Sequence, residues 1–166
     1  MRFQMLRGAC FFGALALIAA FVLSVPARAQ FAAPSPDSAL SIPKAQLIQA
    51  DQLSQLLLAK GGTRPLVLQV GSHLMFDQAH IVGSEYAGPG SQPAGLKLLQ
   101  DRVSPLPRST FIVLYCGCCP WERCPNLGPA FKLVHDLGFS NVKALYIADN
   151  FGTGWVDKGY PVERGR

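Results

Sequence analysis

Four of the five cysteines in this chain lie between residues 116 and 124, directly after a run of β-branched and aromatic residues. They are Cys116, Cys118, Cys119 and Cys124. A cysteine thiolate is a nucleophile and is also a ligand for soft metal ions. The segment therefore predicts thiol chemistry, which is either attack on a soft atom such as sulfur, exchange with disulfides, or binding of a soft ion.

The sequence on either side of the cysteines predicts how they are positioned. Residues 110–115 form a short β-branched and aromatic run after a turn-rich segment, which favours a buried strand. Residues 130–137 have apolar side chains at helical spacing, and Gly138 stands where a C-terminal cap belongs. A strand, a cysteine loop and a helix in this order aim backbone N–H groups and the positive helix end at the loop. We expect this environment to stabilise a thiolate.

The rest of the chain alternates short apolar strands with amphipathic helices. Strands are expected at 47–48, 65–70 and 142–147, with a turn-rich loop at 150–154. One helix is expected to start with Asp51 as its N-cap, and another spans 91–103. This order predicts an α/β fold with a mostly parallel central sheet and helices on both faces. Ligands of such folds bind at the carboxyl ends of the strands, where Tyr115 and Cys116 lie.

The N-terminal residues resemble a targeting segment. Arg2 and Arg7 precede a long apolar run, and residues 27–29 read Ala-Arg-Ala, so residues 1–29 are predicted to be a signal peptide that takes Cys10 with it. The alternative is an uncleaved membrane anchor. Residues 30–44 are predicted to form a flexible tether and 45–166 the folded domain, in the periplasm or secreted. Much of the formal charge of +5 belongs to the signal segment, so no nucleic-acid partner is expected.

From residue 47 to 163 the chain resembles a single rhodanese domain. Four segments carry the resemblance, and they occur in the family's order: 80–84 (His-Ile-Val-Gly-Ser), 112–116 (Ile-Val-Leu-Tyr-Cys), 137–142 and 155–162. The resemblance implies a sulfurtransferase of the thiosulfate type without a cofactor. In this function Cys116 would accept sulfane sulfur from a small donor such as thiosulfate. It would hold the sulfur as a persulfide and pass it to a thiophilic or thiol acceptor.

Two departures from the family pattern concern the site. Residues 69–71 read Gln-Val-Gly where the family usually carries Asp-x-Arg, and the cysteine loop is longer than the family's short sulfurtransferase loop. Arg123 stands one position too far from Cys116, and one too close to Cys118, to match the phosphate-binding arginine of the related phosphatases. Phosphatase and arsenate reductase activities are therefore disfavoured.

Other residues near the loop have predicted roles. Gly117 and Arg123 are the predicted substrate-binding residues, because guanidinium matches an oxyanion donor; the alternative for Arg123 is an exposed loop charge. His80 is predicted to be a structural histidine with satisfied hydrogen bonds rather than a general base. Trp155 is expected in the core.

The accessory thiols Cys118, Cys119 and Cys124 admit three interpretations. They could resolve a persulfide on Cys116 and leave a disulfide for a redox partner protein. They could complete, with Cys116, a binding site for Cu(I) or Zn. They could also form a disulfide between Cys124 and either Cys118 or Cys119 that staples the loop. A non-enzymatic metal-binding or thiol-redox module is therefore the main alternative to the sulfurtransferase.

Overall fold

Five parallel strands form the central sheet of the computed structural model, which describes residues 42–165. Their order is β1 (Leu47–Ile48), β6 (Val142–Leu145), β5 (Ile112–Tyr115), β2 (Leu66–Gln69) and β4 (Glu85–Tyr86). The predicted α/β class and its parallel sheet are confirmed. The predicted signal peptide and most of the predicted tether lie outside the described residues.

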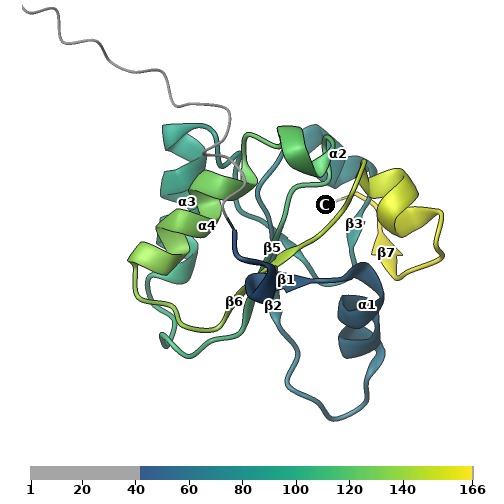
Figure 1. Ribbon diagram of the computed structural model, residues 1–166, viewed down its shortest axis with the longest axis horizontal. Helices are drawn as coiled ribbons and strands as arrows, with labels where there is room; N and C mark the ends of the chain where they lie inside the picture. Colours follow the sequence, from purple (N-terminus) through teal and green to yellow (C-terminus); the bar gives the residue numbers. More distant parts are fainter. Residues whose placement is uncertain (1–41, 166) are drawn as a thin grey trace, which may run out of the picture. The chain divides into compact units, whose positions relative to one another are not determined.

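Helices cover both faces of this sheet (Figure 1). On one face lie α3 (Pro93–Val103) and α4 (Leu127–Asp136), and on the other lie α1 (Ala50–Leu58) and the π-helical turn η4 (Gly152–Val156). Because side chains alternate along a strand, Val113 and Tyr115 pack toward α1. Leu114 and the following Cys116 pack toward α3 and α4, so the nucleophile candidate belongs to that side of the sheet.

A small antiparallel pair joins the end of the chain to its middle. Strand β3 (His80–Ile81) pairs with β7 (Val162–Glu163), and the short helix α2 (His73–Gln78) precedes it. His80 and Ile81 are thus in a strand, and the turn of the 80–84 segment starts only after them. The short 3-10 helix η2 (Lys44–Gln46) leads into β1, and the Lys143 ammonium of β6 donates to the Ala45 carbonyl.

Two local expectations were wrong. Helix α1 is capped by Gln49 instead of Asp51: the Gln49 and Gln52 side chains reciprocally bond the two backbones in a capping box. Asp51 lies in the first turn, where a carboxylate is favoured by the helix dipole. The predicted loop at 150–154 instead leads into the turn η4, because the Asn150 side chain and carbonyl accept hydrogen bonds from Thr153 and start a helical turn there.

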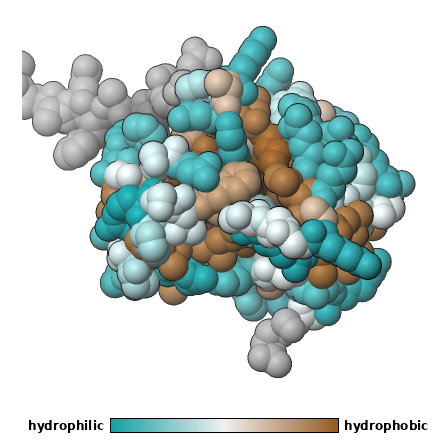
Figure 2. Space-filling view, turned by 90° about the horizontal axis from the view of Figure 1, so that it is seen from below, coloured by the Kyte–Doolittle hydropathy of each residue, from teal (hydrophilic) through white to brown (hydrophobic). Residues whose placement is uncertain are grey.

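Among residues 42–165, no helix is both long and apolar enough to cross a membrane. Seen from below, the molecule exposes hydrophobic residues near the middle of one face, between hydrophilic ones (Figure 2). Some apolar surface is ordinary for a folded protein, and the large exposed side chains Leu58, Leu74 and Leu98 belong to three different helices. These three side chains therefore do not form one apolar patch on a single helix.

Candidate functional site

The four thiols of the 116–124 segment converge at the carboxyl end of β5. Their sulfur atoms all lie within 4.8 Å of one another, and all four are free thiols. The Cys118 sulfur is 3.0 Å from that of Cys116 and 3.3 Å from that of Cys119. Cys116 and Cys124 are buried, whereas Cys118 and Cys119 are half-buried. The structure therefore brings all the predicted thiols into one cluster that is closed on one side and accessible on the other.

Gln69 fixes the backbone at which the cluster begins. Its side chain is buried at the end of β2, beside Tyr115 in the sheet. Its amide oxygen accepts the Gly71 N–H at 3.1 Å, and its amide nitrogen donates to the Cys116 carbonyl at 3.4 Å. The sequence marked Gln69 only as a departure from the family pattern. In the structure this neutral amide ties the end of β2 to the first residue of the cysteine loop.

Gly71 leaves space beside the Cys116 sulfur. A Cβ atom at position 71 would lie 3.0 Å from that sulfur and 3.2 Å from the Cys116 carbonyl oxygen. Both distances are shorter than ordinary carbon contacts, so a side chain here would displace Cys116. The loop after β2 therefore needs a residue without a side chain at position 71, beside the Cys116 sulfur.

Asn126 is the polar residue that faces the sulfurs, and the sequence analysis missed it. It occupies the N-cap position of α4 without a side-chain capping bond, and it is buried. Its side-chain oxygen accepts the Ser91 N–H at 3.0 Å and the Ser91 hydroxyl at 2.7 Å, which turns the amide nitrogen toward Cys116 at 3.4 Å and Cys118 at 3.7 Å. An asparagine at a helix start just after the last cysteine was the available signal.

Hydrogen bonds within the cluster shift the pKa values of the four thiols in different directions. Hydrogen bonds from Cys116 and then Cys124 lower the pKa of Cys118, whereas hydrogen bonding to Cys118 and Cys124, together with burial, raises the pKa of Cys116. Burial raises the pKa of Cys119. The pKa of Cys124 is raised overall. The hydrogen bond with Cys116 lowers it, as do the backbone N–H groups of Asn126 and Leu127, but the hydrogen bond with Cys118 and burial raise it. The backbone N–H groups at the start of α4 thus act on the pKa of Cys124, and Cys118 is the thiol whose pKa is lowered.

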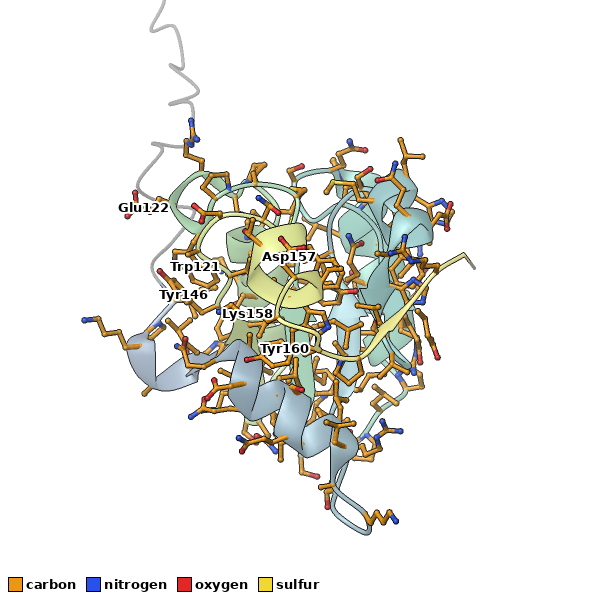
Figure 3. All side chains as sticks on the ribbon, turned by 90° about the vertical axis from the view of Figure 1, so that its right-hand side faces the viewer. Trp121, Glu122, Tyr146, Asp157, Lys158 and Tyr160 are labelled. Atoms are coloured by element: carbon orange, nitrogen blue, oxygen red, sulfur yellow. The ribbon has the colours of Figure 1, made fainter. Side chains whose placement is uncertain are left out.

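Two backbone hydrogen bonds anchor the loop to the segment that follows β6. The Gly117 carbonyl accepts the Phe151 N–H, and the Trp121 N–H of the 3-10 turn η3 (Trp121–Arg123) donates to the Ala148 carbonyl, both at 2.9 Å. The Trp121 ring packs 5.2 Å from that of Tyr146 (Figure 3). These contacts hold the long loop in one path around the sulfurs.

Comparisons with known proteins agree on the fold. No protein-family model matches the sequence. A search of curated proteins also finds no match. Among solved structures, the rhodanese-like domain of the Alr3790 protein from Anabaena sp superposes with a TM-score of 0.54 at 22% identity, over 72% of this chain and 79% of that one. A crystal structure of the same protein gives 0.54 at 24% identity, over 70% and 82%. The chain has a rhodanese-like fold. The BH2092 protein from Bacillus halodurans is similar to it as well, with a TM-score of 0.53 at 22% identity over 71% and 76%.

Within this rhodanese-like fold, the other predicted residues occupy different places. Gly117 is buried with a φ of +70°, and Arg123 is exposed on η3, where its carbonyl faces the Cys119 sulfur at 3.7 Å. Their roles in substrate binding stay predictions. His80 stacks on Phe76 at 3.9 Å and bonds the Phe76 carbonyl through Nδ1 at 2.8 Å, so its hydrogen bonding is satisfied as predicted. Trp155 is fully buried, as expected.

A cavity of about 510 Å³ opens near the ends of β1 and β6. Tyr146, Lys158 and Tyr160 are among its lining residues, and Figure 3 shows them on one side of the molecule with Trp121 and Asp157. No cysteine of the described chain lines it. The thiol chemistry and this cavity therefore occupy separate places, although the Tyr146 ring contacts the cysteine loop through Trp121.

Proposed function

We propose that this protein is a sulfurtransferase that carries sulfane sulfur as a persulfide on Cys116. The observation that carries the proposal is the position of Cys116, the first residue after the central strand β5 at the carboxyl end of a parallel sheet with a rhodanese-like fold. Ligands of open α/β sheets bind at this edge. A cysteine thiolate there is a suitable nucleophile for sulfur.

The reaction is a pair of displacements at sulfur. The Cys116 thiolate attacks the outer sulfur of thiosulfate, so that a new S–S bond forms, the donor's S–S bond breaks and sulfite leaves. The thiolate of an acceptor then attacks the outer sulfur of the persulfide and takes it, which regenerates the Cys116 thiolate.

Neighbouring groups suit an anionic persulfide. The Asn126 amide nitrogen lies 3.4 Å from the Cys116 sulfur, and N–H donors stabilise negative charge on sulfur. Gly71 leaves the flank of that sulfur free of a side chain. We assign recognition of the anionic donor to Arg123, whose guanidinium matches an oxyanion, and to the Gly117 backbone.

The proposed setting is the periplasm or the outside of the cell, after removal of residues 1–29. Partners would then be a small sulfur donor such as thiosulfate and a thiophilic or thiol acceptor. An exported thiol protein meets oxidising conditions, so a reductant for the cluster is also part of the proposal.

A thiol-redox role is the second candidate, and the 3.0 Å separation of the Cys116 and Cys118 sulfurs favours it. In this reaction the Cys118 thiolate attacks the inner sulfur of the Cys116 persulfide, releases hydrosulfide and leaves a Cys116–Cys118 disulfide. A partner dithiol would then reduce that disulfide and be oxidised itself.

Mass spectrometry of the loop peptide tests both candidates. After treatment of reduced protein with thiosulfate, we expect one added sulfur on Cys116 that cyanide removes as thiocyanate. Cys116→Ser should abolish this species, whereas Cys118→Ser should retain part of it. An unmodified peptide in the reduced, metal-free protein would contradict the transferase. A Cys116–Cys118 disulfide with release of sulfide would instead support the redox role.

A further inference from the structure

Sulfur transfer uses one thiol and leaves three buried or half-buried thiols beside it. We propose that all four cysteines bind a single Zn²⁺ ion in a closed tetrahedral site. We also propose that the bound ion blocks sulfur transfer, because it takes Cys116 as a ligand. This inference goes beyond the proposed activity: it assigns a metal site and a form of the protein in which Cys116 cannot react.

The positions of the four sulfurs fit one ion. A tetrahedral zinc–thiolate site has Zn–S bonds of about 2.3 Å, which places its sulfurs about 3.8 Å apart. In the structure the nearest pair is separated by 3.0 Å, and no pair by more than 4.8 Å. Shifts below about 1 Å in these separations would therefore complete the site. Four thiolates in a tetrahedron select zinc or iron–sulfur centres among biological metals.

The same positions do not single out a disulfide pair. Cys118 lies almost equally close to the sulfurs of Cys116 and Cys119, at 3.0 and 3.3 Å, and Cys124 lies within 4.8 Å of all three. A staple between Cys124 and Cys118 or Cys119 would leave one accessory thiol beside Cys116 without a role. Four sulfur atoms that all lie within 4.8 Å of one another form the compact set that a single metal ion requires.

Polar groups around the sulfurs would balance the charge of such a site. A zinc ion with four thiolates carries two negative charges, and N–H donors to the sulfurs stabilise them. The Asn126 amide donates to Cys116 and Cys118. Cys124 lies three residues before the start of α4, and a helix N-terminus favours negative charge.

The exposure of the ligands indicates how an ion enters and what it does. Cys118 and Cys119 are half-buried and give access from solvent, whereas Cys116 and Cys124 form the buried side. Binding exchanges thiol protons for the ion and involves no oxidation or reduction. With four protein ligands no coordination position stays open for a substrate, as in structural zinc sites. Zinc would thus hold the loop closed and keep the Cys116 sulfur from attacking thiosulfate.

Metal titration of the reduced, chelator-treated chain tests the site. We expect one Zn²⁺ per chain with release of protons, and we expect Co²⁺ to give the intense visible and sulfur-to-metal charge-transfer bands of a tetrahedral thiolate. Cys119→Ser should weaken zinc binding at least tenfold. The matched control is His135→Ala, which removes an exposed potential ligand on α4 and should change nothing. Failure to bind zinc, binding of Cu(I) in its place, or binding that survives Cys119→Ser would overturn the zinc assignment.

A second measurement tests the block. Zinc-loaded protein treated with thiosulfate should form at least tenfold less Cys116 persulfide than zinc-free protein, and a chelator should restore it. In Cys119→Ser the same zinc concentration should no longer protect Cys116. Equal labelling of zinc-loaded and zinc-free protein would overturn the block. If zinc-free protein forms no persulfide, the sulfurtransferase proposal fails, while the titration still decides the metal site.

Discussion

The side-chain oxygen of Asn126 accepts two hydrogen bonds from Ser91, one from its N–H and one from its hydroxyl, and this pairing aims the Asn126 amide nitrogen at Cys116. An asparagine amide can donate only from its nitrogen, so the Ser91 N–H fixes which end faces the sulfur. A residue just before α3 thereby orients the N-cap residue of α4 toward the thiols. Residues far apart in the sequence cooperate to present one N–H group.

Replacing this donor should slow the proposed reaction. Asn126→Asp puts a carboxylate where the amide donates to sulfur and repels the thiolate and the persulfide. Loss of a hydrogen bond to a charged group costs about 1.5–3 kcal/mol, which is roughly a 10- to 100-fold slower rate of persulfide formation. Ser91→Ala is the milder comparison, because the Ser91 N–H still orients the amide. If the Asn126→Asp variant reacts as fast as the parent, the amide has no part in catalysis.

The loop conformation depends on glycine at position 117. Its φ is +70°, and a Cβ there would lie 2.8 Å from the Phe151 Cβ. We expect Gly117→Ala to lower the free energy of unfolding by more than about 2 kcal/mol, as backbone strain and crowding add. Gly83→Ala is the matched control, with a φ of +69° and open space around it. It should cost only about 1 kcal/mol. If urea denaturation gives equal losses in the free energy of unfolding for both variants, Phe151 moves away from the new Cβ without an energetic cost.

A carboxylate in place of the Gln69 amide should destabilise the fold. Gln69→Glu keeps an acceptor for the Gly71 N–H but places an anionic oxygen against the Cys116 carbonyl, where the amide nitrogen now donates. We expect a loss of about 1–3 kcal/mol in the free energy of unfolding. The exposed Gln100→Glu on α3 provides the comparison and should stay within about 0.5 kcal/mol of the parent. Similar denaturation midpoints for both variants would refute this role of Gln69.

The ion pair between Glu85 of β4 and Arg102 of α3 predicts a small acid sensitivity. The hydrogen bond from Arg102 lowers the pKa of Glu85, and the Arg102 Nη2 atom lies 2.9 Å from Oε1. A carboxyl whose pKa is lower in the folded state stabilises the fold above its unfolded pKa, and this stabilisation is lost as the pH falls through the folded value. Because the pair is partly exposed, its contribution is below about 1 kcal/mol. Below about pH 4.5, thermal melts of Glu85→Gln should lose less stability than those of the parent. Parallel pH profiles would contradict this.

The strands and helices that could be predicted from the sequence are those set by the pattern of neighbouring residues. The run 112–115 is continuously apolar or aromatic, 142–145 is apolar except for Lys143, and the spacing in α4 is helical, so their identities follow from short-range pattern. The clustering of the thiols also followed, since they are neighbours along the chain. Strands of two residues, such as β3 and β4, are too short to show alternation, and the six-residue α2 shows no helical period.

The remaining errors concern tertiary contacts. In the sequence, Gln69 and Asn126 are ordinary polar residues. Their roles follow only from the packing of β2, α3 and α4. Their partners, Cys116 and Ser91, lie 47 and 35 positions away along the chain. The pKa of each thiol depends on tertiary contacts as well: hydrogen bonding to Cys118 and Cys124 and burial raise the pKa of Cys116, while the start of α4 acts on Cys124.

The packing of Trp121 on Tyr146 gives the cysteine loop an intrinsic optical reporter. The chain contains two tryptophans, and the other, Trp155, is fully buried on the opposite side of the sheet. In a Trp155→Phe background, emission would come from the loop alone. Its intensity and wavelength would then follow, in real time and without a label, whether the loop is held by a metal, carries extra sulfur or has been oxidised.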